Sequence, residues 1–334
     1  PPERSPLSAS GCPEHLTPSV CYVVVADTNA AMADMAAAFY GDPSRQLKLV
    51  GITGTNGKTT TVTLLYDLFR GLGYKVGLDL DGPFTASTPN ASNRPHTTPD
   101  AIRLNEMMAR MVEAGCEYCF MEVSSHAIVQ ERIRGLHFTG GIFSNITHDH
   151  LDYHKTFAEY IRAKKLFFDN LPKEAFALVN IDDRNGRVMV QNTRATVKTL
   201  SLQSMADFRC KILETHPDGM ELRIDGREVW VHFLGRFNAY NLLSVYAAAL
   251  LLGADREEVL QIMSTLHPVS GRFEFVRPPT APRRSSITPI RPTLWKKCSR
   301  PSRRSAARDN SSSCCAAAAA TGTRPNAPKW RRSP

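Results

Sequence analysis

The stretch Val50–Thr60, VGITGTNGKTT, decides the fold of this chain. An apolar run over Leu47–Ile52 enters a glycine-rich turn, and Lys58 opens a segment with the apolar spacing of an amphipathic helix. In such a strand–loop–helix unit, glycines let the backbone approach phosphate groups, and N–H groups at the helix start point at the anion. The lysine supplies positive charge, and the threonine hydroxyl after it can hold Mg²⁺. We predict that nucleotide phosphates bind Gly54, Thr55, Asn56, Gly57, Lys58, Thr59 and Thr60.

Length and composition are those of a soluble globular protein. The chain has 334 residues, enough for two domains, and 22% of them are charged. No apolar run reaches the roughly 18 residues that a membrane-spanning helix needs, and the first residues form no signal-peptide core. We therefore expect a cytoplasmic protein with no membrane partner, and a chain that begins as a fragment.

The positive charge is concentrated in the tail. The net charge is +9, but residues 277–334 contain 14 Lys and Arg against one acid, Asp309. The preceding body contains 27 basic and 31 acidic residues, a net charge of −4. The basic balance is therefore no argument for a nucleic-acid partner of the body.

Strand and helix patterns alternate after Leu47. The expected strands are Leu47–Thr53, Lys75–Leu80, Tyr118–Val123, Gly141–Ile146 and Phe176–Ile181. The expected helices between and after them are Lys58–Leu72, Pro99–Ala114, Phe157–Leu171 and Arg184–Gln191. This alternation predicts an α/β fold with a central doubly wound, mostly parallel sheet. Short alternating runs in residues 208–234 predict a small antiparallel meander. Elsewhere we expect a strand over Cys21–Val25 and helices over Asn29–Tyr40, Phe237–Leu252 and Arg256–Thr265.

Polar clusters follow the predicted parallel strands, where ligands bind in sheets of this type. Glu122 ends an apolar run, and a carboxylate there is costly unless it is paired or binds a metal. After another strand come His148, Asp149, His150, Asp152 and His154. Oxygen and imidazole ligands opposite a phosphate loop suit Mg²⁺. A solvated loop with helix-capping aspartates is the alternative, and zinc lacks a tetrahedral set with the usual spacing.

Six motifs in a fixed order carry a resemblance to a known family. They are TGTNGKTT (Thr53–Thr60), TTPD (Thr97–Asp100), MEVSSHA (Met121–Ala127), FSNITHDHLDYH (Phe143–His154), LGRFNAYNLL (Leu234–Leu243) and GRFE (Gly271–Glu274). From about Cys21 to Arg277 the chain resembles the Mur ligase family. EVSSHA together with DHLDYH is most similar to the branch that adds the third residue of the peptidoglycan stem.

The resemblance implies an ATP site with two Mg²⁺ ions. Thr59 and Glu122 would hold one ion, and Glu122 and His150 would help to hold the second. Lys164, in YIRAKKLF, matches the lysine that reacts with CO₂ to form a carbamate, a hard oxygen ligand for Mg²⁺. The adjacent Lys165 and a surface role for Lys164 are the alternatives. The implied catalytic set is Lys58, Glu122, His150 and Lys164.

The resemblance also implies which residues hold the other ligands. The UDP-sugar dipeptide would be held by Thr97, Thr98, Ser124, Gln130 and Arg132. Asn238 and Asn241 would lie near the adenine, with a role in helix capping as the alternative.

The implied reaction is ATP-dependent amide formation. The D-Glu carboxylate of UDP-MurNAc-L-Ala-D-Glu would attack the γ-phosphate of ATP, while Lys58 and two Mg²⁺ ions spread the charge. The amine of a diamino acid would then attack the acyl phosphate. We expect a monomer that uses meso-diaminopimelate. An L-lysine-adding ligase of the same family and a folylpolyglutamate-synthase-like ligase are the alternatives.

The composition changes abruptly after Arg277. The last 58 residues contain nine Pro but only three residues among Leu, Ile, Val and Phe, too few to bury a core. We therefore divide the chain into four parts. They are a remnant of an N-terminal UDP-binding domain (1–46), a central ATP-binding domain (47–270), the start of a C-terminal ligase domain (271–277) and a disordered tail (278–334).

A shifted reading frame explains this tail. A DNA string that encodes VDYAHTPDALEKVLE, which resembles the start of the family's third domain, reads one base later as SITPIRPTLWKKCS, the sequence Ser286–Ser299. A second string, which encodes LLCGCGGDRDPTKRPEM and continues with the codon GCG, gives Cys314–Arg331 with the same shift. We expect the chain as written to keep its ATP and sugar sites but to be inactive. A natural basic tail, a non-catalytic nucleotide-binding remnant and an ATPase acting on nucleic acid are competing hypotheses.

Overall fold

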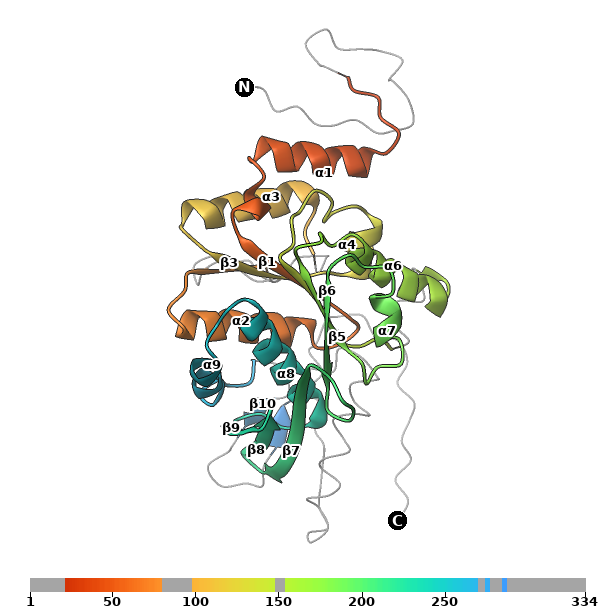
Figure 1. Cartoon of the computed structure of the whole chain (residues 1–334). Helices are drawn as coiled ribbons and strands as arrows, with labels where there is room; N and C mark the ends of the chain where they lie inside the picture. The colour runs from red at the N-terminus through yellow and green to blue at the C-terminus, as the bar shows by residue number, and fades with distance from the viewer. Residues whose placement is uncertain (1–21, 80–97, 148–153, 270–273, 277–283, 287–334) are drawn as a thin grey trace, which may run out of the picture. The chain divides into compact units, whose positions relative to one another are not determined.

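The structure is a computed structural model that describes residues 22–79, 98–147, 154–269, 274–276 and 284–286 (Figure 1). The chain divides into two units, residues 1–267 and 268–334. The first unit contains a large sheet with helices on both faces. The described part of the second unit contains one antiparallel pair, β10 (Glu274–Val276) and β11 (Arg284–Ser286).

Within the described residues the large sheet has nine strands in the order β2-β3-β1-β4-β5-β6-β7-β8-β9. Neighbouring strands from β2 to β7 are parallel, whereas β8 runs antiparallel to β7, and β9 runs antiparallel to β8. The strands are β1 (Lys48–Thr53), β2 (Val76–Asp79), β3 (Tyr118–Glu122), β4 (Gly140–Phe143), β5 (Phe176–Asn180), β6 (Thr196–Ser201), β7 (Phe208–His216), β8 (Gly219–Ile224) and β9 (Arg227–Val231).

Strand β1 lies inside the parallel part, between β3 and β4. Its residue Ile52 lies in register with Glu122 of β3 on one side and with Ile142 of β4 on the other. The carboxyl ends of these three strands therefore meet at one edge of the sheet. This is the edge where ligands bind in doubly wound folds.

Helices cover both faces of the sheet, as the doubly wound prediction requires (Figure 1). On one face α2 packs against α8 and α9. On the other face α6 packs against α4 and α7, and α3 packs against α1. The helices are α1 (Thr28–Phe39), η1 (Pro43–Arg45), α2 (Lys58–Gly71), α3 (Ala101–Glu113), α4 (Ser125–Val129), α6 (Phe157–Asp169), α7 (Gly186–Met189), α8 (Arg236–Leu251) and α9 (Arg256–Met263).

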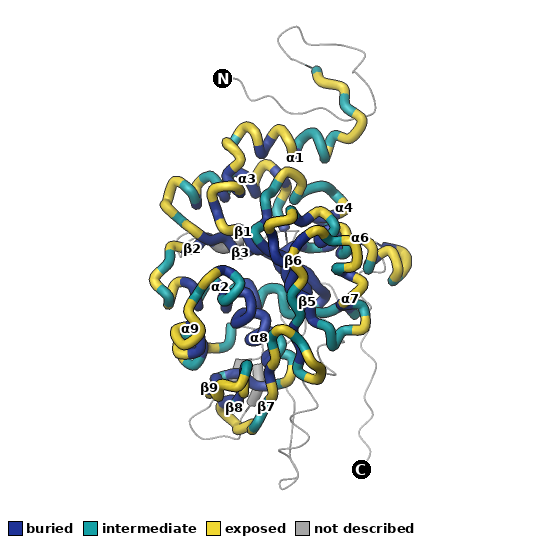
Figure 2. The backbone as a smooth tube through the Cα atoms, viewed as in Figure 1, coloured by how far each residue is buried: buried dark blue, intermediate teal, exposed yellow. Residues whose placement is uncertain are grey.

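The strands of the sheet are largely buried (Figure 2), and most of the buried residues are apolar. Leu104 of α3, Phe143 of β4 and Phe168 of α6 belong to one continuous buried cluster. On the other face, Phe69 of α2 packs its ring against Phe120 of β3. Burying a side chain of this size contributes about 1.5–3 kcal/mol. The parallel strands read as apolar runs because they are buried on both faces.

Polar side chains fix where several helices begin. Each cap accepts a hydrogen bond from a backbone N–H of the first helical turn, which stabilises a helix by about 1 kcal/mol. The capping residues are Asp27 (α1), Asp100 (α3), Ser124 (α4), Thr156 (α6) and Asp255 (α9).

Most expected elements occur within three residues of their expected bounds, but the strand over Cys21–Val25 is wrong. Tyr22–Val25 is not a strand, because Val23 and Val24 are 62% and 66% exposed and no described strand pairs with them. The sequence did not predict β6 or α4. Three residues of the segment expected to be disordered, Arg284–Ser286, form β11. Within the described ranges, no helix combines the length and the apolar character needed to cross a bilayer.

Candidate active site

Residues Gly54–Gly57 connect β1 to α2 at the carboxyl edge of the sheet. Gly54 has φ +149° and Gly57 has φ +91°, backbone conformations that favour glycine. A Cβ atom on Gly54 would lie 2.0 Å from Ser144 Oγ, and one on Gly57 would lie 2.5 Å from Asn241 Oδ1. The loop ends at the N-terminus of α2, where backbone N–H groups and the helix dipole favour an anion.

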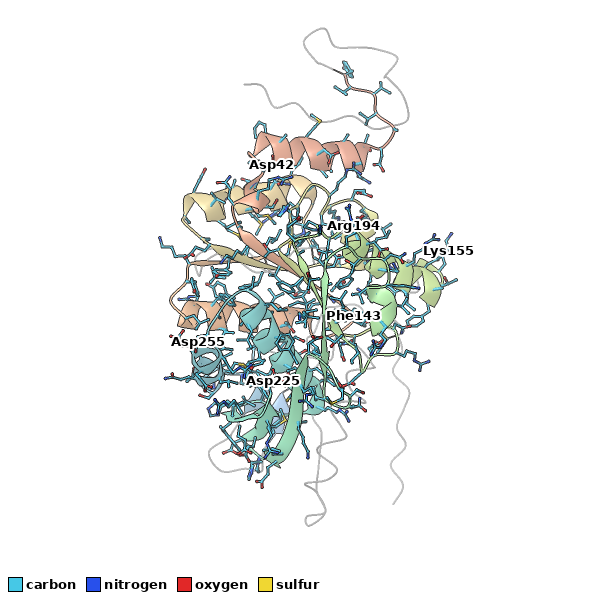
Figure 3. All side chains as sticks on the ribbon, in the orientation of Figure 1. Asp42, Phe143, Lys155, Arg194, Asp225 and Asp255 are labelled. Atoms are coloured by element: carbon cyan, nitrogen blue, oxygen red, sulfur yellow. The ribbon has the colours of Figure 1, made fainter. Side chains whose placement is uncertain are left out.

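The residues after β4 hold this loop in place. Phe143, labelled in Figure 3, ends β4, and the next two residues contact the loop. Ser144 Oγ and Asn145 Nδ2 both donate to the carbonyl oxygen of Asn56, at 2.8 and 2.9 Å. Among the described residues, Asn56 Nδ2 is buried without a hydrogen-bond partner, which leaves a donor for a ligand anion. Sequence reasoning missed these two contacts, although both residues belong to the FSNITHDHLDYH motif.

Two lysines from different helices converge on the loop. Lys58 Nζ of α2 donates to the carbonyl oxygens of Gly54 at 3.0 Å and Thr55 at 3.2 Å. Lys164 Nζ of α6 donates to the same Gly54 oxygen at 3.0 Å. Burial, and then the positive charge of Lys58, hold the pKa of Lys164 well below the usual lysine value. This environment favours the neutral, nucleophilic form of the Lys164 amine.

Lys164, and not its neighbour Lys165, faces the loop. Lys165 Nζ forms an ion pair with Asp169 Oδ1 at 2.6 Å. Lys164 is 1% exposed, so the alternative of a surface lysine at this position is wrong. Its Nζ lies 4.8 Å from the centre of the Tyr160 ring, and the Tyr160 hydroxyl lies 3.2 Å from Thr55 Oγ1. Sequence reasoning did not single out Tyr160.

Thr59 and Glu122 meet beside the loop. The Thr59 hydroxyl donates to Glu122 Oε1 at 2.7 Å, and Glu122 is 4% exposed at the end of β3. A buried carboxylate is costly without a compensating charge, and hydroxyl and carboxylate oxygens suit Mg²⁺. The pair therefore fits a magnesium ion. No group of three His, Cys, Asp or Glu that could hold a metal occurs in the described ranges. His150 and Thr97 lie outside the described residues, so their roles stay predictions.

The other residues expected to hold the sugar dipeptide form one connected cluster next to Glu122. Thr98 Oγ1 donates to the carbonyl oxygen of Glu122 at 3.1 Å and accepts from the backbone N–H of Ser124 at 3.2 Å. Arg132 Nη1 donates to the carbonyl oxygen of Thr98 at 2.7 Å, and Arg132 Nη2 donates to Gln130 Oε1. The structure thus brings four of the five expected residues together beside the proposed metal position.

Asn238 and Asn241 are both buried near the start of α8. Asn238 Nδ2 donates to the carbonyl oxygen of Leu234 at 2.9 Å, a bond that holds the turn before the helix. Asn241 borders the phosphate loop at Gly57 and donates to Asn238 Oδ1 at 3.3 Å. Contact of either residue with an adenine stays a prediction.

Two aspartates after β5 brace the same edge of the sheet, and sequence reasoning missed them. Asp182 accepts from Ser201 Oγ at 2.6 Å and from the Tyr240 hydroxyl of α8 at 2.7 Å. Burial alone would raise the pKa of Asp182, but these hydrogen bonds outweigh burial and the pKa is lowered. Asp183 Oδ2 accepts from the backbone N–H of Ile146 at 2.8 Å. Paired carboxylates directly after a buried strand are the signal that could have found them.

The parts described so far lie at one edge of a parallel sheet. They are a glycine-rich loop at a helix N-terminus, two lysine amines, a hydroxyl–carboxylate pair and a connected polar cluster. The fold and this site define a nucleotide-phosphate-binding α/β domain with a loop of the P-loop type.

Comparison with known proteins identifies the family. Residues 52–249 match the model of the Mur ligase middle domain, and the chain belongs to the Mur ligase family. Two similar curated relatives are UDP-N-acetylmuramoyl-L-alanyl-D-glutamate--2,6-diaminopimelate ligases. The ligase of Cytophaga hutchinsonii is 59% identical over 263 residues, 78% of this chain and 54% of the relative. The ligase of Parabacteroides distasonis is 58% identical over 267 residues, 80% of this chain and 55% of the relative.

A solved structure described by the same ligase name is also similar. It matches with a TM-score of 0.68 at 26% identity, and the match covers 79% of this chain and 55% of the solved chain. The chain therefore spans about half the length of the relatives that it matches.

Proposed function

We propose that this chain belongs to an ATP-dependent ligase that joins meso-diaminopimelate to UDP-MurNAc-L-Ala-D-Glu. The observation that carries the proposal is the convergence of Lys58, Lys164 and the Thr59–Glu122 pair on the glycine loop. Both bacterial relatives named above carry the name of a diaminopimelate-adding ligase, which favours this amino acid over L-lysine.

The site supports reaction through an acyl phosphate. Lys58 and the N-terminus of α2 would hold the phosphates of ATP. Thr98 and Arg132 would place the D-Glu carboxylate so that one of its oxygens attacks the γ-phosphorus and ADP leaves. The amine of the diamino acid then attacks the carbonyl carbon, inorganic phosphate leaves, and the nitrogen loses a proton. Thr59 and Glu122 would hold Mg²⁺, which neutralises phosphate charge when bound.

Lys164 would carry the carbamate in this proposal. A neutral amine is needed to attack CO₂, and burial beside Lys58 favours that form. The carbamate oxygens, with Glu122 and His150, would complete the second Mg²⁺ site. We propose further that the protein acts as a monomer in the cytoplasm.

Residues 278–334 enter the proposal as a segment read out of frame. Their low apolar content and the two family-like strings hidden one base away support this reading. Residues 278–334 would then stand where the relatives' ligase-domain sequence is expected, without encoding it. We expect binding of Mg²⁺–ATP and of the UDP-sugar dipeptide, without turnover.

Isothermal titration calorimetry tests the proposed sites. The chain should bind Mg²⁺ with a non-hydrolysable ATP analogue, and should bind UDP-MurNAc-L-Ala-D-Glu. Lys58→Met should weaken the ATP analogue at least tenfold, because it removes the charge at the loop, whereas the exposed Lys173→Met should leave the affinity unchanged. Failure of the parent chain to bind the ATP analogue would refute the proposal.

A further inference from the structure

A buried column of four side chains joins helix α4 to the phosphate loop, and its three members outside that loop have no role in the proposed chemistry. The column consists of Ser125, His154, Tyr160 and Thr55, and all four residues are buried. Ser125 is the first residue of α4, and Thr55 lies in the loop between β1 and α2. The column therefore connects the two halves of the proposed site.

Specific contacts link each member of the column to the next. His154 Nε2 lies 2.8 Å from Ser125 Oγ. The His154 ring centre lies 5.1 Å from that of Tyr160, and the Tyr160 hydroxyl lies 3.2 Å from Thr55 Oγ1. Leaving a buried polar group without its partner costs about 1–3 kcal/mol, so these bonds favour one arrangement of the four side chains.

Ser125, at the α4 end of the column, is linked to the proposed sugar-dipeptide cluster. Ser125 directly follows Ser124, whose hydroxyl caps α4 by accepting from the backbone N–H of Ala127 at 3.1 Å. The backbone N–H of Ser124 donates to Thr98, one of the four clustered residues. A displacement of Ser125 would therefore displace the start of α4 and this cluster with it.

Thr55, at the other end of the column, is part of the phosphate loop. Thr55 Oγ1 accepts from the backbone N–H of Thr147 at 3.0 Å, and the Thr55 carbonyl oxygen accepts from Lys58. The ring of Tyr160 also lies under the Lys164 amine. A ligand that orders the loop would therefore restrict the motion of the Tyr160 side chain. Because the two rings are in contact, it would also restrict the motion of the His154 side chain.

We propose that His154 is a positioning residue that couples the two substrate sites. It holds α4 and the phosphate loop at a fixed spacing, so a nucleotide bound at the loop also orders the start of α4. The inference rests on the proposed function, since it takes a nucleotide as the ligand of the loop. Ordering of one site by a ligand at another is a coupling free energy, and by linkage it acts equally in both directions.

Hydrogen–deuterium exchange tests this coupling in the full chain. The probe is Mg²⁺–ADP, and the readout is exchange of the α4 amides with and without it. We expect Mg²⁺–ADP to slow exchange in α4 of the parent chain by at least threefold. Ser125→Ala and His154→Phe each remove the hydrogen bond, and each should abolish the slowing. His154→Gln keeps a polar group within reach of Ser125, so this variant should retain part of the slowing of exchange in α4.

The double variant sharpens the test. Ser125→Ala and His154→Phe remove the same bond, so in urea unfolding the double variant should lose less stability than the sum of the two single losses. Additive losses would contradict a shared bond between these two side chains.

Ser44→Ala is the matched control. Ser44 is another buried serine, whose hydroxyl accepts from the backbone N–H of His137 at 3.0 Å, and it precedes β1 at the amino end of the strands. This variant should lose a similar amount of stability and keep the slowing in α4. A stability loss alone would therefore not mimic the loss of coupling.

Two outcomes overturn the inference in distinguishable ways. If the parent chain binds Mg²⁺–ADP by calorimetry but α4 exchange is unchanged, or if His154→Phe keeps the full slowing, the coupling is wrong and the proposed function stands. If the parent chain does not bind Mg²⁺–ADP, the proposed function and the coupling both fail.

Discussion

Lys58 and Lys164 donate hydrogen bonds to the same carbonyl oxygen, that of Gly54, and each Nζ lies 3.0 Å from it. Two ammonium groups on one acceptor repel each other, and Lys164 is the one that is fully enclosed. The electrostatic repulsion between the two amines is therefore removed when Lys164 loses its proton. In the proposed function, Lys58 would supply a positive charge for the phosphates and Lys164 would supply a nucleophilic amine.

Replacing Lys164 by methionine should change how stability depends on pH. Burial and Lys58 lower the pKa of Lys164, so the native state binds fewer protons than the unfolded state between that lowered pKa and 10.5. The stability of the parent chain therefore rises with pH through this window, and Lys164→Met loses that rise. Urea unfolding in CO₂-free buffer between pH 7 and pH 10 measures the difference.

The control for this prediction is Lys165→Met, which keeps Lys164 and should keep the rise. Curves of stability against pH that run parallel for the parent chain and Lys164→Met would contradict a lowered pKa at Lys164.

Alanine at Gly57 should cost more stability than alanine at Gly73. Both glycines have a positive φ, +91° and +89°. A Cβ on Gly57 would meet Asn241 Oδ1 at 2.5 Å, whereas a Cβ on Gly73 has no atom within 4 Å. Gly73→Ala should therefore cost only the backbone penalty of about 1–2 kcal/mol. Thermal and urea unfolding compare the two variants.

The clash at Gly57 can be separated from its backbone strain. Gly57→Ala combined with Asn241→Ala removes the close atom, so it should recover part of the loss that the single Gly57 variant shows. Equal costs at Gly57 and Gly73 would show that Asn241 does not restrict the loop.

Glu122→Gln should remove the effect of magnesium on nucleotide affinity. Glutamine still accepts from Thr59 but lacks the negative charge that attracts the ion. We expect Mg²⁺ to strengthen ADP binding to the parent chain, and this gain should fall roughly tenfold in the variant. Calorimetry with and without Mg²⁺ measures it, with the exposed Glu159→Gln as control. An unchanged gain would exclude Glu122 as a ligand.

Local sequence signals predicted the parallel core because its strands are buried on both faces and read as apolar runs. β6 escaped prediction because its first two residues, Thr196 and Val197, are exposed and the run is mixed. Helix α4 has five residues, too few for a periodic pattern. The run at Cys21–Val25 has β-branched residues, but β propensity needs a neighbouring strand to act.

The site was predictable where one short segment carries its chemistry, as in the loop that contains Lys58. Adjacent residues of a helix point about 100° apart, and the sequence alone did not decide whether Lys164 or Lys165 faces the loop. The contacts of Asn145 and Asp182 depend on how several strand ends meet, which no local pattern encodes.

The central claim is that this chain joins an intact nucleotide site to an out-of-frame C-terminal segment. An assay for amide formation by the purified chain tests this claim most directly. The purified chain is incubated with Mg²⁺–ATP, UDP-MurNAc-L-Ala-D-Glu and meso-diaminopimelate, and ADP release and the amide product are followed by mass spectrometry. We predict that the chain binds Mg²⁺–ATP but forms no amide. Substrate-dependent ADP release with amide formation would contradict this prediction.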